Sequence, residues 1–140
     1  MEITRDIASA RYHTEDFEVL LEDLLTEIRT RNYRVTRINH IDNIHDRREA
    51  GIDVTIGFKH YKIVEFCNLN SCSELISADL SSGVFMPVKF VVYQENEQDE
   101  VTIAFLKPTA FAALYQSESL TRVAADLEKD MTEILDEMGY

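Results

Sequence analysis

Residues 61–94 read YKIVEFCNLNSCSELISADLSSGVFMPVKFVVYQ, and this stretch contains two apolar runs that are typical of β-strands. The first run covers residues 60–67 and the second covers residues 87–94. A polar turn at residues 96–99 follows, and residues 100–107 form the expected hairpin partner of the second run. This part of the chain therefore predicts an antiparallel sheet.

Amphipathic helices are expected on both sides of these strands. Apolar residues recur at helical spacing over residues 17–28, with Thr14 as the expected N-cap and the helix ending near Asn32. A second apolar stripe extends over residues 120–138, and Pro108 can open a helix shortly before it. Both stripes require an apolar surface to cover, and one face of the sheet supplies it.

Two further strands are expected before the cysteines. Residues 2–12 are interpreted as a first strand and residues 33–41 as a second, in which strict alternation would place Arg34, Thr36, Ile38 and His40 on one face. We expect a polar loop or one short helix at residues 42–51 and a short extended piece at residues 52–58. A turn at residues 68–71 and a short helix at residues 72–78 are expected to follow the third strand.

The order strand, helix, strands, helix predicts an α+β fold. We expect an antiparallel four- to five-stranded sheet with two main helices packed on one face. The length of 140 residues fits a single domain over residues 1–140. The other face of the sheet would be a surface for a homodimer or a ligand.

The composition excludes several classes of partner. A net charge of −12, from 14 basic and 26 acidic residues, would repel nucleic acid and an anionic membrane surface. No apolar run approaches the ~18 residues of a membrane span, and the first residues lack the apolar core of a signal peptide. Two cysteines without an export signal indicate a cytoplasmic protein.

Cys67 and Cys72 are the residues most suited to chemistry. A pair at this spacing can form a reversible disulfide, hold a sulfur adduct, bind a metal or haem, or consist of two small inert core residues. Together with His40 and His45 the pair could supply mixed nitrogen and sulfur ligands to a transition metal. His40 with Asp42 could also activate a thiolate nucleophile. Each alternative stays open, and the sequence itself requires no cofactor.

Several segments in this region resemble the domain-of-unknown-function 302 family. KIVEFCNLNSC, FMPVKFVVYQE and VTIAFLKP carry the resemblance, with Phe66, Asn68, Pro87 and His40 at matching positions. The resemblance implies a compact α+β fold of the TATA-binding-protein-like kind and a dimer, and it implies no activity. The chain has Cys67 where the family usually has Gly, and Cys72 lies near a later Gly of the family.

These observations favour a small cytoplasmic binding or redox-responsive module over an enzyme. Its site would comprise Cys67, Asn68 and Cys72, with His40 as an auxiliary residue, and its partner would be a small molecule or a protein. The alternative is a structural or protein-interaction domain that forms a homodimer and has inert cysteines. A thiol-dependent enzyme is the weaker third hypothesis.

Overall fold

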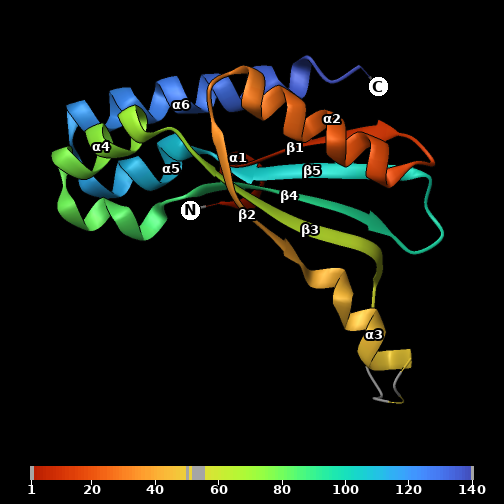
Figure 1. Cartoon of the computed structure of the whole chain (residues 1–140). Helices are drawn as coiled ribbons and strands as arrows, with labels where there is room; N and C mark the ends of the chain where they lie inside the picture. The colour runs from red at the N-terminus through yellow and green to blue at the C-terminus, as the bar shows by residue number, and fades with distance from the viewer. Residues whose placement is uncertain (1, 50, 52–55, 140) are drawn as a thin grey trace.

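The chain folds around one five-stranded antiparallel sheet with the order β1-β5-β4-β3-β2 (Figure 1). This computed structural model describes residues 2–49, 51 and 56–139. Because β3, β4 and β5 succeed one another as antiparallel neighbours, they form the centre, and β1 and β2 lie at opposite edges. The strands are β1 (Ile7–His13), β2 (Arg34–His40), β3 (Phe58–Cys67), β4 (Val88–Glu95) and β5 (Glu100–Leu106).

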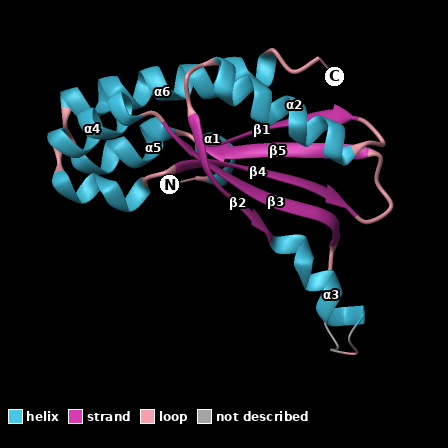
Figure 2. Ribbon diagram, viewed as in Figure 1, coloured by secondary structure: helices cyan, strands magenta, loops and turns pink. Residues whose placement is uncertain are grey.

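Two long helices, α2 and α6, cover the same face of this sheet (Figure 2). The shorter α4 and α5 lie beside one end of the sheet, and α3 projects from the other end. This arrangement confirms the predicted α+β fold. The helical segments are α1 (Ile3–Asp6), α2 (Phe17–Thr30), η1 (Ile41–Asn43), α3 (Ile44–Glu49), α4 (Leu69–Ala78), η2 (Leu80–Phe85), α5 (Pro108–Ala112), η3 (Ala113–Tyr115) and α6 (Glu118–Asp136).

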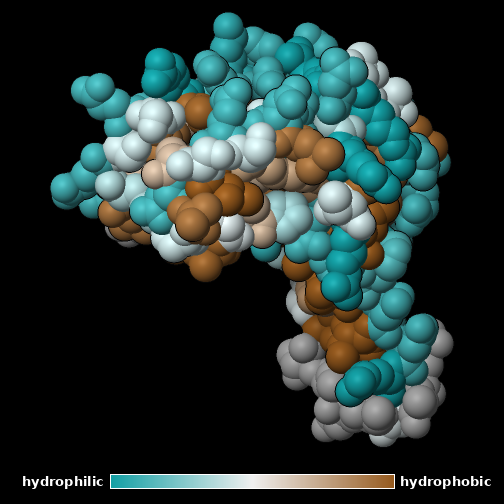
Figure 3. All heavy atoms as spheres, turned by 60° about the vertical axis from the view of Figure 1, so that its left-hand side comes forward, coloured by the Kyte–Doolittle hydropathy of each residue, from teal (hydrophilic) through white to brown (hydrophobic). Residues whose placement is uncertain are grey.

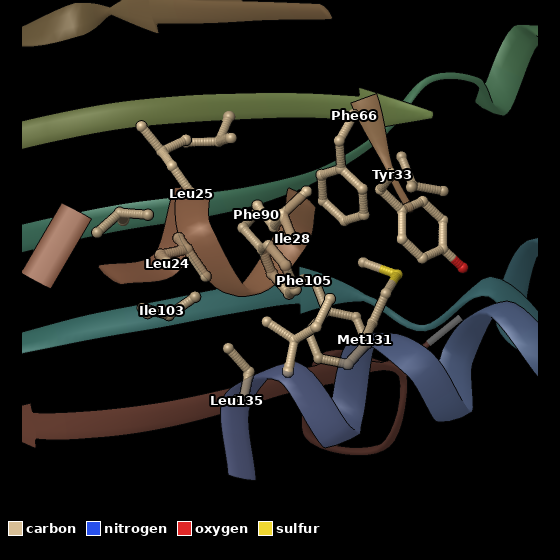
Figure 4. Close-up of a cluster of buried hydrophobic side chains, with 14 of the residues drawn as sticks. Leu24, Leu25, Ile28, Tyr33, Phe66, Phe90, Ile103, Phe105, Met131 and Leu135 are labelled. Carbon is tan, nitrogen blue, oxygen red and sulfur yellow. The ribbon is translucent and has the colours of Figure 1, made fainter. Parts of the chain in front are cut away.

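The hydrophobic core lies between the sheet and these two helices (Figure 4). Phe66 of β3 packs with its ring centroid 5.0 Å from that of Phe90 on β4, and Phe90 meets Phe105 of β5 at 5.5 Å. Each fully buried side chain of this size contributes about 1.5–3 kcal/mol of transfer free energy. The helices supply Leu20, Leu24, Ile28, Leu127, Met131 and Ile134, all 0–2% exposed.

Local hydrogen bonds correct the predicted start of the chain. The first strand begins at Ile7, because residues 3–6 form the short helix α1, in which the Asp6 carboxylate accepts the Glu2 N–H at 2.7 Å. The N-cap of α2 is Asp16, whose side chain accepts from Val19 N at 3.1 Å. Thr14 instead accepts from Asp16 N at 3.1 Å, so the predicted N-cap was two residues early.

The connecting segments follow the predictions in part. Pro108 opens α5 as expected, and the polar segment after β2 contains the short helix α3. The predicted turn at residues 68–71 was wrong, because α4 begins at Leu69 directly after its cap. The extended piece predicted at residues 52–58 lies largely outside the described residues, although Phe58 already belongs to β3.

A bulge in β2 breaks the alternation expected for that strand. Val35 pairs with Phe66 and Arg37 with Glu65, so Thr36 is the additional residue. Val35 and Ile38 consequently both pack against the core, although strict alternation would have placed them on opposite faces. The bulge leaves Arg34 paired with Cys67 at the start of the strand. No helix among the described residues is long and apolar enough to cross a bilayer.

Candidate functional site

A disulfide joins Cys67 and Cys72, the two residues that the sequence singled out. Cys67 is the last residue of β3 and Cys72 the fourth of α4, and their Cα atoms lie 6.7 Å apart. Cys72 is 7% exposed, whereas Cys67 is only partly buried. The bond therefore connects the end of a central strand to the first turn of a helix, with one sulfur more accessible than the other.

Asn68 fixes the geometry between the two cysteines. Its side-chain oxygen accepts the Asn70 N–H at 2.9 Å and the Ser71 N–H at 3.3 Å, which caps α4. Its side-chain amide donates to the Asn32 carbonyl at 3.3 Å, just before β2. One side chain thus holds the start of α4 against the entry to β2, which makes the predicted site residue Asn68 a positioning residue.

A pocket of about 890 Å³ opens beside this junction, within the usual size range of small-molecule sites. Its walls come from the start of β2, the end of β3, the helix α4 and the segment that leads from η2 into β4. Figure 3 shows hydrophobic surface gathered on the α4 end of the molecule, next to a hollow that separates this end from the α3 arm. The lining residues are Asn32, Arg34, Thr36, Cys67, Asn68, Leu69, Asn70, Ile76, Gly83, Met86 and Pro87.

Arg34 is the charged residue of this lining. It is exposed, and among the described residues no carboxylate lies within ion-pair distance of its guanidinium. The lining also includes apolar side chains, among them Leu69, which is 82% exposed. A pocket that combines apolar surface with an unpaired cation can bind an amphipathic molecule that carries negative charge.

The predicted auxiliary residue His40 lies at the other end of β2. Cys67 pairs with Arg34, whereas His40 pairs with Lys62 of β3. Five residues of β3 separate those pairing positions, which corresponds to roughly 17 Å along an extended strand. The structure therefore brings Cys67, Asn68 and Cys72 together and does not bring His40 to them.

Charged side chains at the His40 end bind one another. Lys62 Nζ lies 2.8 Å from Asp42 Oδ1 and 2.9 Å from His40 Nδ1. Asp42 also accepts the Tyr61 N–H at 3.1 Å, and its side chain is only 9% exposed. Because Asp42 and His40 are engaged here, neither faces the Cys67 sulfur as an activating base would.

Two more histidines belong to this end of the strands. His60 stacks on Phe17 with ring centroids 4.5 Å apart, and burial lowers the pKa of His60 although Asp42 Oδ2 lies 3.9 Å away. His45 Nε2 lies 3.1 Å from the Lys59 carbonyl oxygen. Over the described ranges, no three His, Cys, Asp or Glu side chains gather closely enough to hold a metal ion. The predicted ligands Cys67, Cys72, His40 and His45 thus occupy two separate places.

Sequence reasoning did not find Arg34, Met86 and Pro87 as site residues. Arg34 reaches the site because the β2–β3 register pairs it with Cys67, and a register is not visible in one sequence. Met86 and Pro87 reach it through the return of the chain from η2 into β4. The closely spaced pair of Cys67 and Cys72, with Asn68 between them at a position that matches the family, was the signal that did identify the site.

Comparison with known proteins agrees with this architecture. The sequence profile described as "Domain of unknown function DUF302" matches residues 10–138. The chain belongs to the DUF302 family. A crystal structure of an uncharacterized conserved DUF302 protein from Bacillus stearothermophilus is similar, with a TM-score of 0.79 and 26% sequence identity. That match covers 94% of this chain and 97% of the other, and no curated protein matches the sequence.

Proposed function

We propose that this DUF302 protein is a small cytoplasmic binding module whose pocket responds to thiol–disulfide exchange. The observation that carries the proposal is the place of the cysteines: Cys67 lines the pocket, and Cys72 lies in the helix that forms its wall. Forming or breaking one bond therefore changes how firmly α4 is tied to the end of β3. In the cytoplasm stable disulfides are rare, and those that form are usually transient or redox-sensing.

The exchange would begin at Cys67. A small-molecule thiolate attacks Cys67 Sγ, which is the more accessible sulfur, and Cys72 leaves as a thiolate within the first turn of α4. Positive potential at a helix N-terminus favours such a thiolate. A second thiol then releases Cys67, so two thiols are oxidised to one small-molecule disulfide while the protein gains two electrons and two protons.

Equilibration in glutathione redox buffers tests this proposal. We expect the Cys67–Cys72 pair to convert reversibly between disulfide and dithiol in the folded protein, measured by alkylation of free thiols and mass spectrometry. Amide NMR signals of Leu69, Asn70 and Gly83, which line the pocket, should shift with the redox state. A pair that stays in one state over the whole range, or that changes without any shift in those signals, contradicts the proposal.

Single-cysteine variants provide the matched controls. Cys72→Ser leaves Cys67 alone, and Cys67→Ser leaves Cys72 alone. Because Cys72 is 7% exposed, alkylation of Cys67 in the first variant should be faster than alkylation of Cys72 in the second. The Cys67→Ser/Cys72→Ser double variant, which has no thiol to exchange, should show no redox-dependent shifts in the pocket signals.

The competing proposal is an interaction domain that forms a homodimer and has inert cysteines. The face of the sheet opposite α2 and α6 supports it, because Tyr61 and Tyr93 stack there at 5.5 Å beside the cross-strand pair Ile63 and Val91. This proposal predicts redox-independent pocket signals and a dimer in sedimentation velocity, which Val91→Glu should dissociate. A monomer at all concentrations would contradict it.

A further inference from the structure

The composition of the pocket wall differs from that of the chain as a whole. The protein has 26 acidic residues and a net charge of −12, yet the 11 described residues that line the pocket include Arg34 and no Asp or Glu. Other hollows combine opposite charges: Arg122 shares one with Glu74 and Asp126, and Arg11 shares another with Glu95 and Glu100. Among the described residues, the Arg34 guanidinium therefore shares its pocket with no carboxylate, unlike Arg122 and Arg11.

Polar groups around Arg34 are also available to a ligand. The side-chain amides of Asn32 and Asn70 line the pocket and make no hydrogen bond to any described residue. Asn68, in contrast, has its oxygen committed to the cap of α4, and Thr36 donates to the Glu65 carbonyl at 3.2 Å. The α4 N-terminus adds the positive end of a ten-residue helix.

The same pocket has an apolar part of its wall. Ile76 of α4 contributes to it together with Leu69, Met86 and Pro87. Leu69, the first residue of α4, is 82% exposed, and contact with an apolar ligand would remove its side chain from water. A pocket with one cationic edge and one apolar wall matches a molecule with one anionic end and an apolar body.

We infer that the pocket binds a small organic anion, a carboxylate with an apolar body, whose carboxylate pairs with Arg34. The planar guanidinium can receive both carboxylate oxygens, while the body of the ligand lies against Leu69, Ile76 and Met86. This inference rests on the proposed function, because it names the ligand class of the same pocket. A net charge of −12 opposes binding of anions elsewhere on the surface, so a preference for an anion requires a local cause.

A matched pair of probes tests the inference. 4-Phenylbutyrate and its neutral analogue 4-phenylbutanamide have nearly the same shape and differ in charge. We expect the acid to bind the oxidised full chain roughly tenfold more tightly than the amide, since a charge-assisted pair adds about that much. Isothermal titration calorimetry gives both affinities, and NMR shifts of Asn70 and Gly83 place the probe in the pocket.

Arg34→Gln and Arg29→Gln change the net charge equally, so together they separate a local effect of Arg34 on anion binding from a general effect of net charge. Arg34→Gln should remove the preference for the acid. Arg34→Lys should keep part of it, because the positive charge remains although the planar guanidinium that receives both carboxylate oxygens is lost. Arg29→Gln makes the same change of net charge at an exposed residue of α2 and should leave the preference intact. Thermal melting of each variant shows that the fold persists.

Three outcomes would overturn the inference: equal affinity for acid and amide, an acid preference that survives Arg34→Gln, or binding of neither probe. Repeating the titrations on the reduced protein separates this inference from the proposed function. An acid preference that depends on Arg34 but is equal in both redox states would retain the anion site and remove the redox control. Redox-dependent pocket signals without an acid preference would retain the redox control and remove the anion site.

Discussion

Each end of the β2–β3 strand pair carries a basic side chain, Lys62 at one end and Arg34 at the other, and the two differ in their partners. At the His40 end, Lys62 contacts Asp42 and His40, so charge is neutralised within the fold. At the Cys67 end, Arg34 lines the pocket and has no carboxylate among the described residues at ion-pair distance. The difference indicates that the first end contributes stability and that the second end is free to contribute binding.

Removing the carboxylate of the His40 end should produce the largest effect on stability. Asp42→Ala removes the acceptor of the Tyr61 N–H and one of the two partners of Lys62, at a site where the Asp42 and Lys62 side chains are 9–12% exposed. We expect the free energy of unfolding to fall by about 2–3 kcal/mol, measured by urea denaturation.

Arg34→Gln is the matched change at the other end and should alter the free energy of unfolding by no more than about 0.5 kcal/mol. If Asp42→Ala and Arg34→Gln cost the same, the contrast between the two ends is wrong. A double-mutant cycle with Lys62→Met isolates the part of the Asp42 effect that belongs to the Asp42–Lys62 pair.

Reducing the disulfide should have the next largest effect. The bond closes a short loop, with the cysteines five residues apart, and the chain-entropy account gives about 2 kcal/mol for a loop of this size. Urea denaturation with and without a reductant measures this contribution. The Cys67→Ser/Cys72→Ser double variant serves as control, because its stability should not respond to the reductant.

The smallest expected effect concerns pH and His60. Burial lowers the pKa of His60 in the folded protein, so between that pKa and the unfolded value of about 6.5 the unfolded chain binds more protons. Stability should therefore decrease as the pH falls from 7 through this range. His60→Phe keeps an aromatic ring on Phe17 and should flatten the decrease.

His13→Gln serves as the control for this pH dependence. The His13 side chain is 77% exposed, so replacing it should leave the decrease unchanged. Equal pH profiles for the wild type and His60→Phe would show that His60 does not cause the decrease.

Sequence patterns were most informative where burial alone decides the structure. The apolar stripes of α2 and α6 and the runs of β3 and β4 all lie where periodicity placed them. Periodicity failed at Thr36, because a bulge adds one residue without a signal in the pattern. The start of α4 was mistaken for a turn, because Asn68 is the N-cap of this helix and Asn is also favoured in turns.

The site was predictable only as far as it is local in the chain. Cys67, Asn68 and Cys72 are neighbours in sequence, so one segment was sufficient to find them. Arg34 and Met86 come from segments 33 residues before and 19 residues after Cys67 in the sequence. Their meeting depends on strand register and on the path of η2, which are properties of tertiary structure.

The strand order also has a consequence for synthesis of the chain. β1 and β2 are consecutive in sequence, yet each pairs with a strand made later: Ile7 faces Leu106, and Arg34 faces Cys67. During translation β1 has no partner until β5 has emerged, when about three-quarters of the chain has been made, whereas β3, β4 and β5 can each pair with the preceding strand as soon as they emerge. The nascent protein can thus assemble its sheet from the β2 edge through β3, β4 and β5, and β1 closes it at the other edge.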